Sequence, residues 1–100
     1  MRLVSLSVLA GALIACGDDA LEQAAVDYQQ NCKTCHAQGI NGAPIVGNSK
    51  MWQSRQQQGL ETLAKHAIEG YGLMPARGGS QLNDQQIEQV IRYMLKQLPD

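Results

Sequence analysis

Apolar residues recur at helical spacing in several stretches of the chain, with polar residues between them. The clearest stripe lies near the C-terminus and consists of Ile87, Val90, Ile91, Met94, Leu95 and Leu98. This spacing is that of one face of an amphipathic α-helix. Asn83 and Gln86 precede the stripe at the spacing of a capping box, and Pro99 follows it. The pattern predicts a final helix that begins at Asn83 and ends before Pro99.

Weaker apolar stripes predict three further helices. They run from Asp18 or Asp19 into Cys32, from Asn48 or Ser49 to near Gly59, and from Leu60 to Gly70. The glycine- and proline-containing stretches 39–47 and 71–82 predict loops. No segment alternates polar and apolar residues with the period of a strand. We therefore expect an all-α fold of about four short helices.

The first 15 residues have a different pattern. Arg2 precedes an almost unbroken apolar run from Leu3 to Ala15. This run is shorter than the roughly 20 residues that span a bilayer. A basic residue followed by such a run is the layout of a secretory signal peptide. The stretch LIAC, ending at Cys16, resembles the lipobox of bacterial lipoproteins, which implies a lipid on that cysteine. Ordinary cleavage after residues 10–12 and an uncleaved anchor are the alternatives. We expect a leader at 1–15, a lipid-attached tether at 16–20 and one domain at 21–100.

Composition narrows the chemistry of that domain. A formal net charge of −1 gives no indication of nucleic acid binding. A domain this short usually needs a staple, a metal or a cofactor to complete its core. The chain has three cysteines. A lipid on Cys16 would leave Cys32 and Cys35 as a pair.

The stretch from Cys32 to His36 reads CKTCH, which suits three kinds of site. A structural zinc site needs about four ligands, and His66 is the only other histidine. A thioredoxin-like dithiol lies where a strand is followed by a helix, whereas these cysteines follow a helix in a chain with no predicted strand. Cys-x-x-Cys-His is the attachment signature of c-type haem, in which two thiols bond the porphyrin vinyl groups and the adjacent imidazole reaches the iron. Export favours haem, which is attached outside the cytoplasm in bacteria.

A second axial ligand would come from a methionine or from His66. Met94 lies on the stripe of the last helix and Met51 adjoins Trp52, so we expect both to be packing residues. His66 lies off its apolar stripe and is expected in solvent. Met74 stands in a loop directly before Pro75 and is the predicted ligand. A methionine opposite a histidine raises the reduction potential.

With these residues in place, the chain resembles a class I c-type cytochrome. The stretches YGLMPARGG and GAPIVG are similar to the bacterial cytochrome c-five group, and the resemblance covers Leu21 to Leu98. It implies thioether bonds at Cys32 and Cys35, axial ligation by His36 and Met74, a proximal hydrogen bond to the Pro44 carbonyl, and packing of Tyr93 between the last and first helices. Members of that group often carry an extra cysteine pair, which residues 78–81 lack.

The expected function is electron transfer by one haem c, without catalysis or a small-molecule substrate. The carrier would be anchored by lipid at Cys16 on the periplasmic side, between membrane-bound donors and acceptors. The alternatives are a haem enzyme with an open iron site, a thiol-disulfide oxidoreductase using Cys32 and Cys35, and a fixed subunit of a larger membrane complex. Trp52 is assigned either to a haem propionate or to the core. Arg55 and Arg77 are expected in solvent, with propionate contacts as the alternative.

Overall fold

The computed structural model describes residues 16–99, so the predicted leader lies outside the described residues. Its elements are α1 (Cys16–Asn31), α2 (Lys33–His36), η1 (Ile40–Gly42), α3 (Ser49–Gln57), α4 (Leu60–Glu69), η2 (Ala76–Gly79) and α5 (Asp84–Lys96). Here η denotes a short 3₁₀ turn. Residues 16–99 contain no strand beyond an isolated bridge between Tyr71 and Met74. The predicted all-α fold class is confirmed, with α2 as an additional short helix.

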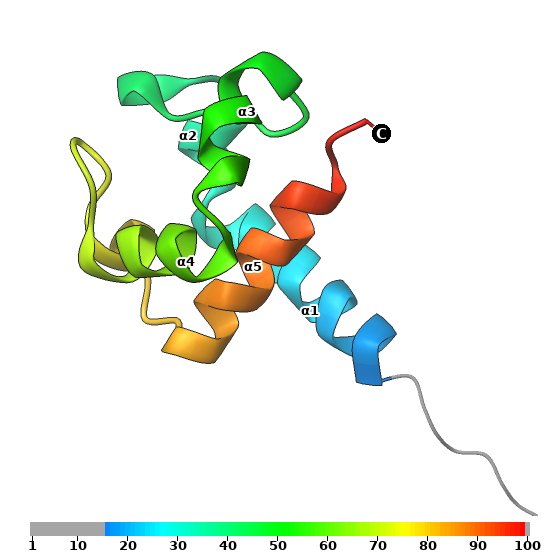
Figure 1. Ribbon diagram of the computed structural model, residues 1–100. Helices are drawn as coiled ribbons and strands as arrows, with labels where there is room; N and C mark the ends of the chain where they lie inside the picture. The colour runs from blue at the N-terminus through cyan, green and yellow to red at the C-terminus, as the bar shows by residue number, and fades with distance from the viewer. Residues whose placement is uncertain (1–15, 100) are drawn as a thin grey trace, which may run out of the picture.

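The first and last helices cross and pack against each other (Figure 1). The predicted contact of Tyr93 is present, because its ring lies 5.6 Å from the ring of Tyr28 on α1, centroid to centroid. The α5 helix begins as its sequence predicts: the Asn83 side chain accepts from the Gln86 N–H, and the Gln86 side chain accepts from the Asn83 N–H. This capping box fixes where the apolar face of α5 starts.

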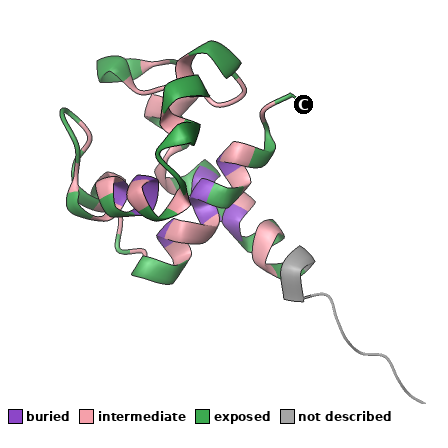
Figure 2. Cartoon of the chain, viewed as in Figure 1, coloured by how far each residue is buried: buried purple, intermediate pink, exposed green. Residues whose placement is uncertain are grey.

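The buried residues form two clusters. One joins α1, α3 and α5 through Ala24, Tyr28, Trp52, Val90 and Met94. The other joins α4 and α5 through Leu63, Ala64, Ala67, Ile87 and Ile91. Figure 2 shows that buried residues are found mainly on α1, α4 and α5, whereas α3 and the loops beside it are mostly exposed or half-buried. The clusters share Leu82 and Leu95 as half-buried neighbours.

The start of α1 differs from the sequence-based expectation. The helix begins at Cys16 rather than after Asp18 or Asp19, so residues 16–20 are helical and do not form an extended tether. Acidic residues are favourable in a first helical turn because they face the positive end of the helix dipole, so they need not mark a cap. Within residues 16–99, no helix combines the length and apolar character needed to cross a bilayer.

Candidate functional site

The Cys-x-x-Cys-His segment forms a tight helical turn at the end of α1. The Cys32 N–H donates to the Tyr28 carbonyl at 2.8 Å, and the His36 N–H donates to the Cys32 carbonyl at 3.0 Å. Both Cys32 and Cys35 are half-buried free thiols. The turn therefore presents two thiols and one imidazole within a single helical turn, anchored to α1.

His36 is oriented by the carbonyl that the resemblance implied. Its Nδ1 lies 2.9 Å from the Pro44 carbonyl oxygen. Since a carbonyl only accepts, this contact requires a proton on Nδ1, and the neutral ring then has an unprotonated Nε2. Burial lowers the pKa of His36, and the nearby Arg55 lowers it further, against the opposing effect of the Pro44 hydrogen bond. The predicted hydrogen bond to Pro44 is confirmed, and Nε2 is available to bind a metal.

The loop after His36 is held against α3. The Val46 N–H donates to the His36 carbonyl at 2.8 Å. The Trp52 indole N–H donates to the Ile45 carbonyl at 2.9 Å, and the indole is only 4% exposed. Of the two assignments for Trp52, a haem propionate or the core, this hydrogen bond and the burial favour the core. Trp52 is a core aromatic that pins the loop beside His36, and the two rings lie 6.3 Å apart, centroid to centroid.

The state of Cys32 argues against thiol redox chemistry. Burial raises the pKa of Cys32 to about 11, with smaller contributions from Asp27 and Cys35. Attacking cysteines of thiol-disulfide oxidoreductases have lowered pKa values, because the thiolate is the nucleophile. A half-buried Cys32 with a raised pKa does not fit that role.

Met74 lies in a constrained loop after α4. Its N–H donates to the Tyr71 carbonyl at 2.9 Å, and the Tyr71 N–H donates to the Met74 carbonyl at 3.0 Å. At Gly70, which has a φ of 92°, an added Cβ would lie 3.2 Å from the Met74 carbonyl oxygen. A side chain there would therefore displace the loop. Met74 is half-buried and packs against the cluster formed by α4 and α5.

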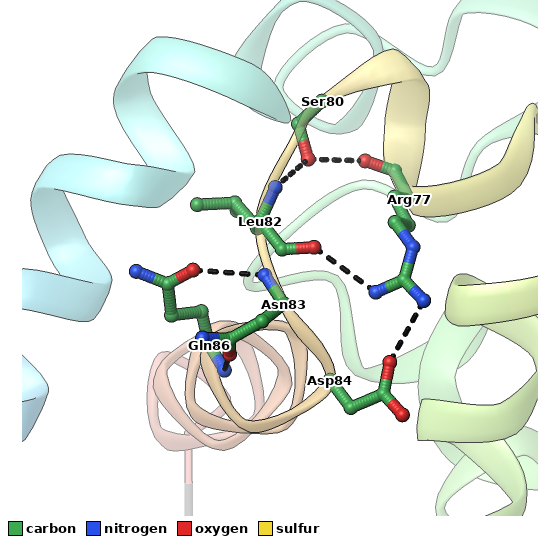
Figure 3. A network of polar contacts seen from close by, with 6 residues as sticks. All are labelled: Arg77, Ser80, Leu82, Asn83, Asp84 and Gln86. Carbon is green, nitrogen blue, oxygen red and sulfur yellow. Dashed lines mark hydrogen bonds and ion pairs between the residues drawn. The ribbon is translucent and has the colours of Figure 1, made fainter.

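The other side of this loop is tied to α5. Arg77 has a φ of 57°, an unfavourable conformation for a residue with a side chain. Its guanidinium donates to the Leu82 carbonyl at 3.0 Å and pairs with the Asp84 carboxylate at 2.8 Å (Figure 3). The Ser80 hydroxyl donates to the Arg77 carbonyl at 2.7 Å. The Arg77 side chain is 33% exposed, so it lies at the surface as expected, and its contacts connect the Met74 loop to the start of α5.

The other ligand candidates have different surroundings. Met94 is 4% exposed in the core, as expected. The Met51 sulfur lies 3.5 Å from the Ile45 N–H, which fits the expected packing role. The His66 ring stacks on Tyr71 at 4.1 Å between centroids and is half-buried rather than free in solvent. Arg55 is likewise half-buried, and its guanidinium donates to the Met51 carbonyl.

The residues present fit a covalently bound haem. The buried side chains among residues 19–99 form two separate clusters rather than one continuous core. Cys32 packs against one cluster and Met74 against the other. The loops that carry the candidate ligands expose apolar side chains: Ile40 is 40% exposed and Leu73 is 71% exposed. A flat, largely apolar group that joined the two clusters would complete this core.

Comparison with known proteins identifies the family. The chain matches the family described as "Cytochrome C oxidase, cbb3-type, subunit III" over residues 19–94. It is 38% identical to cytochrome c-555 of Chlorobaculum tepidum, with 96% of each chain covered. It is also 32% identical to cytochrome c5 of Ectopseudomonas mendocina, over 65% of this chain and 78% of that one.

A solved structure agrees. The protein is similar to a chain in the crystal structure of an electron transfer complex of nitrite reductase with cytochrome c. The TM-score is 0.71 and the sequence identity 31%, and the match covers 78% of this chain and 93% of that chain. The all-α fold, the Cys-x-x-Cys-His turn and these matches agree. The chain belongs to the class I c-type cytochromes and is a monohaem electron carrier that binds one haem c covalently.

Proposed function

We propose that Cys32 and Cys35 form the thioether bonds to haem c, and that His36 Nε2 and the Met74 sulfur are the axial ligands of the iron. The observation that carries this assignment is the Nδ1 contact of His36 with the Pro44 carbonyl at 2.9 Å. A histidine ligand usually donates its second ring N–H to such an acceptor, which fixes the ring and makes the ligand more basic. Two free thiols lie in the same turn.

When bound, the haem supplies an iron centre that accepts and releases one electron at a time. The chain contributes fixed ligands and restricted access to water. The contacts of Met74 with Tyr71, and those of Arg77 with Asp84, hold the methionine loop in place. Filled axial positions leave no room for substrate, so we infer that the protein carries electrons and does not catalyse a haem reaction.

Redox partners would approach the edge of the haem between the two ligand loops. Ile40 follows the attachment motif and Leu73 precedes Met74, and both side chains are exposed. Apolar side chains beside a redox centre suit weak, short-lived contacts that bring two centres close together.

The closed iron is tested by adding a strong external ligand. We expect cyanide or imidazole to leave the visible spectrum of the wild-type holoprotein unchanged, because Met74 occupies the sixth position. The measurement is an optical titration in both oxidation states, with an open-site haem protein as the positive control. Rapid binding to the wild-type protein would instead favour the haem enzyme.

We further propose that Cys16 carries lipid and holds the domain at the periplasmic face of a membrane. The LIAC stretch before the fold supports this proposal. The alignment with the Chlorobaculum tepidum protein covers 96% of both chains and so includes most of the leader. Because α1 starts at Cys16 and has 16 residues, it is about 24 Å long. In the view of Figure 1, the first turn of α1 and the yellow loop that follows α4 lie on opposite sides of the molecule.

A lipid at that end would hold the domain close to the bilayer, with the ligand loops directed away from the attachment point. This position raises the effective concentration of the carrier at membrane-bound donors and acceptors. We propose such complexes as its partners.

The anchor is tested by exporting a Cys16→Ser chain behind a leader that is cleaved without lipidation. We expect the haem protein to leave the membrane fraction with an unchanged spectrum, and electron delivery to membrane complexes to slow. Fractionation and respiration at native abundance are the measurements. The matched control keeps Cys16 and places the chain behind a leader that contains a lipobox, so that the protein is exported and lipidated. Membrane retention of the unlipidated chain, or normal respiration with it, contradicts a functional anchor.

A further inference from the structure

Asp27 is a buried acidic residue on the face of α1 that packs toward the core. Its side chain is only 6% exposed, and it shares that face with Ala24 and Tyr28, which are 1% and 5% exposed. The apolar pattern did not predict this, because Asp27 occupies a position on the helix where an apolar residue would be expected. A charged group removed from water is costly unless a counter-charge or several hydrogen bonds stabilise it.

Asp27 has little such support. Its carboxylate accepts one hydrogen bond, at 3.0 Å, from the amide of Gln23, an exposed residue one turn earlier on α1. Within residues 19–99, the ion pairs are Arg77 with Asp84 and Arg92 with Glu88, and neither includes Asp27. The negative charge is therefore held in the protein interior without a cation beside it.

This carboxylate lies close to the haem-attachment turn. Backbone hydrogen bonds continue from α1 to Cys32, and the Asn31 side chain donates to the Asp27 carbonyl at 3.0 Å. The charge of Asp27 is one cause of the raised pKa of Cys32. The neighbouring Tyr28 hydroxyl is buried and has no hydrogen-bond partner. The region between Asp27 and Cys32 is thus poorly hydrated, so charge acts over a longer range than it would in water.

We infer that the buried carboxylate of Asp27 tunes the haem, lowering its midpoint potential by stabilising the oxidised form. The inference rests on the proposed attachment at Cys32. On reduction, one electron from the donor lowers the charge of the iron centre by one, with no proton required. A fixed negative charge nearby opposes that change. Asp27 touches neither ligand, so it acts as a tuning residue through the field around Cys32.

Neighbouring charges are the same with and without the Asp27 carboxylate, including that of Arg55 on α3, which is half-buried and lowers the pKa of His36. From α5, the titratable side chain on the side of α1 is Tyr93, which is neutral at physiological pH. Arg92 of α5 and Arg77 of η2 are paired with other carboxylates. Lys33 of α2 is exposed, so its charge is screened by water and salt. A carboxylate in this position therefore keeps most of its influence at moderate ionic strength.

The test is Asp27→Asn in the full-length holoprotein, which removes the charge and nearly preserves the shape. We expect the midpoint potential at neutral pH to rise by about 59 mV, which is about a tenfold change in the one-electron equilibrium constant. The increase should persist in high salt. Spectroelectrochemical titration measures each of these.

Asp19→Asn is the matched control, since it removes an exposed carboxylate from the same helix. We expect Asp19→Asn to change the midpoint potential only slightly, and we expect added salt to reduce that small change further. If Asp27→Asn loads haem and shifts the potential no more than Asp19→Asn does, the tuning role is refuted while the haem site stands. Should Asp27→Asn not accept haem, Asp27→Ser removes the same charge with a smaller side chain, and a wild-type potential in that variant also refutes the inference. If the wild-type protein itself does not bind haem covalently, the proposed haem site is refuted instead.

Discussion

Replacing both Cys32 and Cys35 with alanine is expected to abolish covalent haem binding and, with it, the compact fold. The buried side chains form two separate clusters, with Cys32 packed against one and Met74 against the other, so we expect the haem to supply much of the core between them. The haem stays bonded to the wild-type chain, and the double variant loses the apolar contacts that the haem makes in the folded core. Small domains have only about 5–15 kcal/mol of stability in total. Loss of the haem therefore removes a large part of the free energy of unfolding.

The double variant is compared with the wild type by haem staining under denaturing conditions, by visible absorption, and by thermal unfolding followed through helical circular dichroism. The single variants Cys32→Ala and Cys35→Ala separate the two bonds, since each retains one attachment point. Cys16→Ser is the matched cysteine control and should keep haem and fold. A double variant that unfolds cooperatively with full helix content would contradict the prediction.

Met74→Ala is expected to open the iron to external ligands and to lower the reduction potential. The thioether favours the reduced iron, so its loss shifts the equilibrium toward the oxidised form. The loop itself should persist, because Gly70 and the ion pair of Arg77 with Asp84 do not depend on the methionine side chain. The measurements are the spectrum, a titration with imidazole, and the midpoint potential.

Two other methionines serve as controls for that result. Met51→Leu and Met94→Leu preserve apolar volume at a half-buried and a buried position, respectively. Such swaps usually cost less than about 1.5 kcal/mol of stability, and neither should alter the iron spectrum. His66→Ala tests the remaining candidate. An unchanged spectrum and potential in Met74→Ala, together with a changed spectrum in His66→Ala, would exclude Met74 as the ligand.

Local patterns in the sequence were sufficient for the helices and for the attachment turn. The apolar stripe after Asn83 predicted α5 and its capping box, because capping depends on residues three positions apart. The Cys-x-x-Cys-His spacing predicted the site, since all of its groups lie within one helical turn. The hydrogen bond between His36 and the Pro44 carbonyl, eight residues further along the chain, was implied by the family resemblance. The cap and the attachment turn depend on short separations along the chain, and the hydrogen bond to Pro44 came from the resemblance.

Features that depend on how the loops and helices pack were decided by the tertiary structure. The Trp52 indole has one N–H to donate, and the fold places the Ile45 carbonyl within hydrogen-bond distance of it. Arg77 pairs with Asp84 because the turn η2 folds back onto the start of α5. Asp27 is buried because α1 packs that face toward the core, although its side chain is acidic. The sequence determined which groups were available, and packing between α1, α4 and α5 decided which were buried, because burial depends on surfaces that only the folded chain brings together.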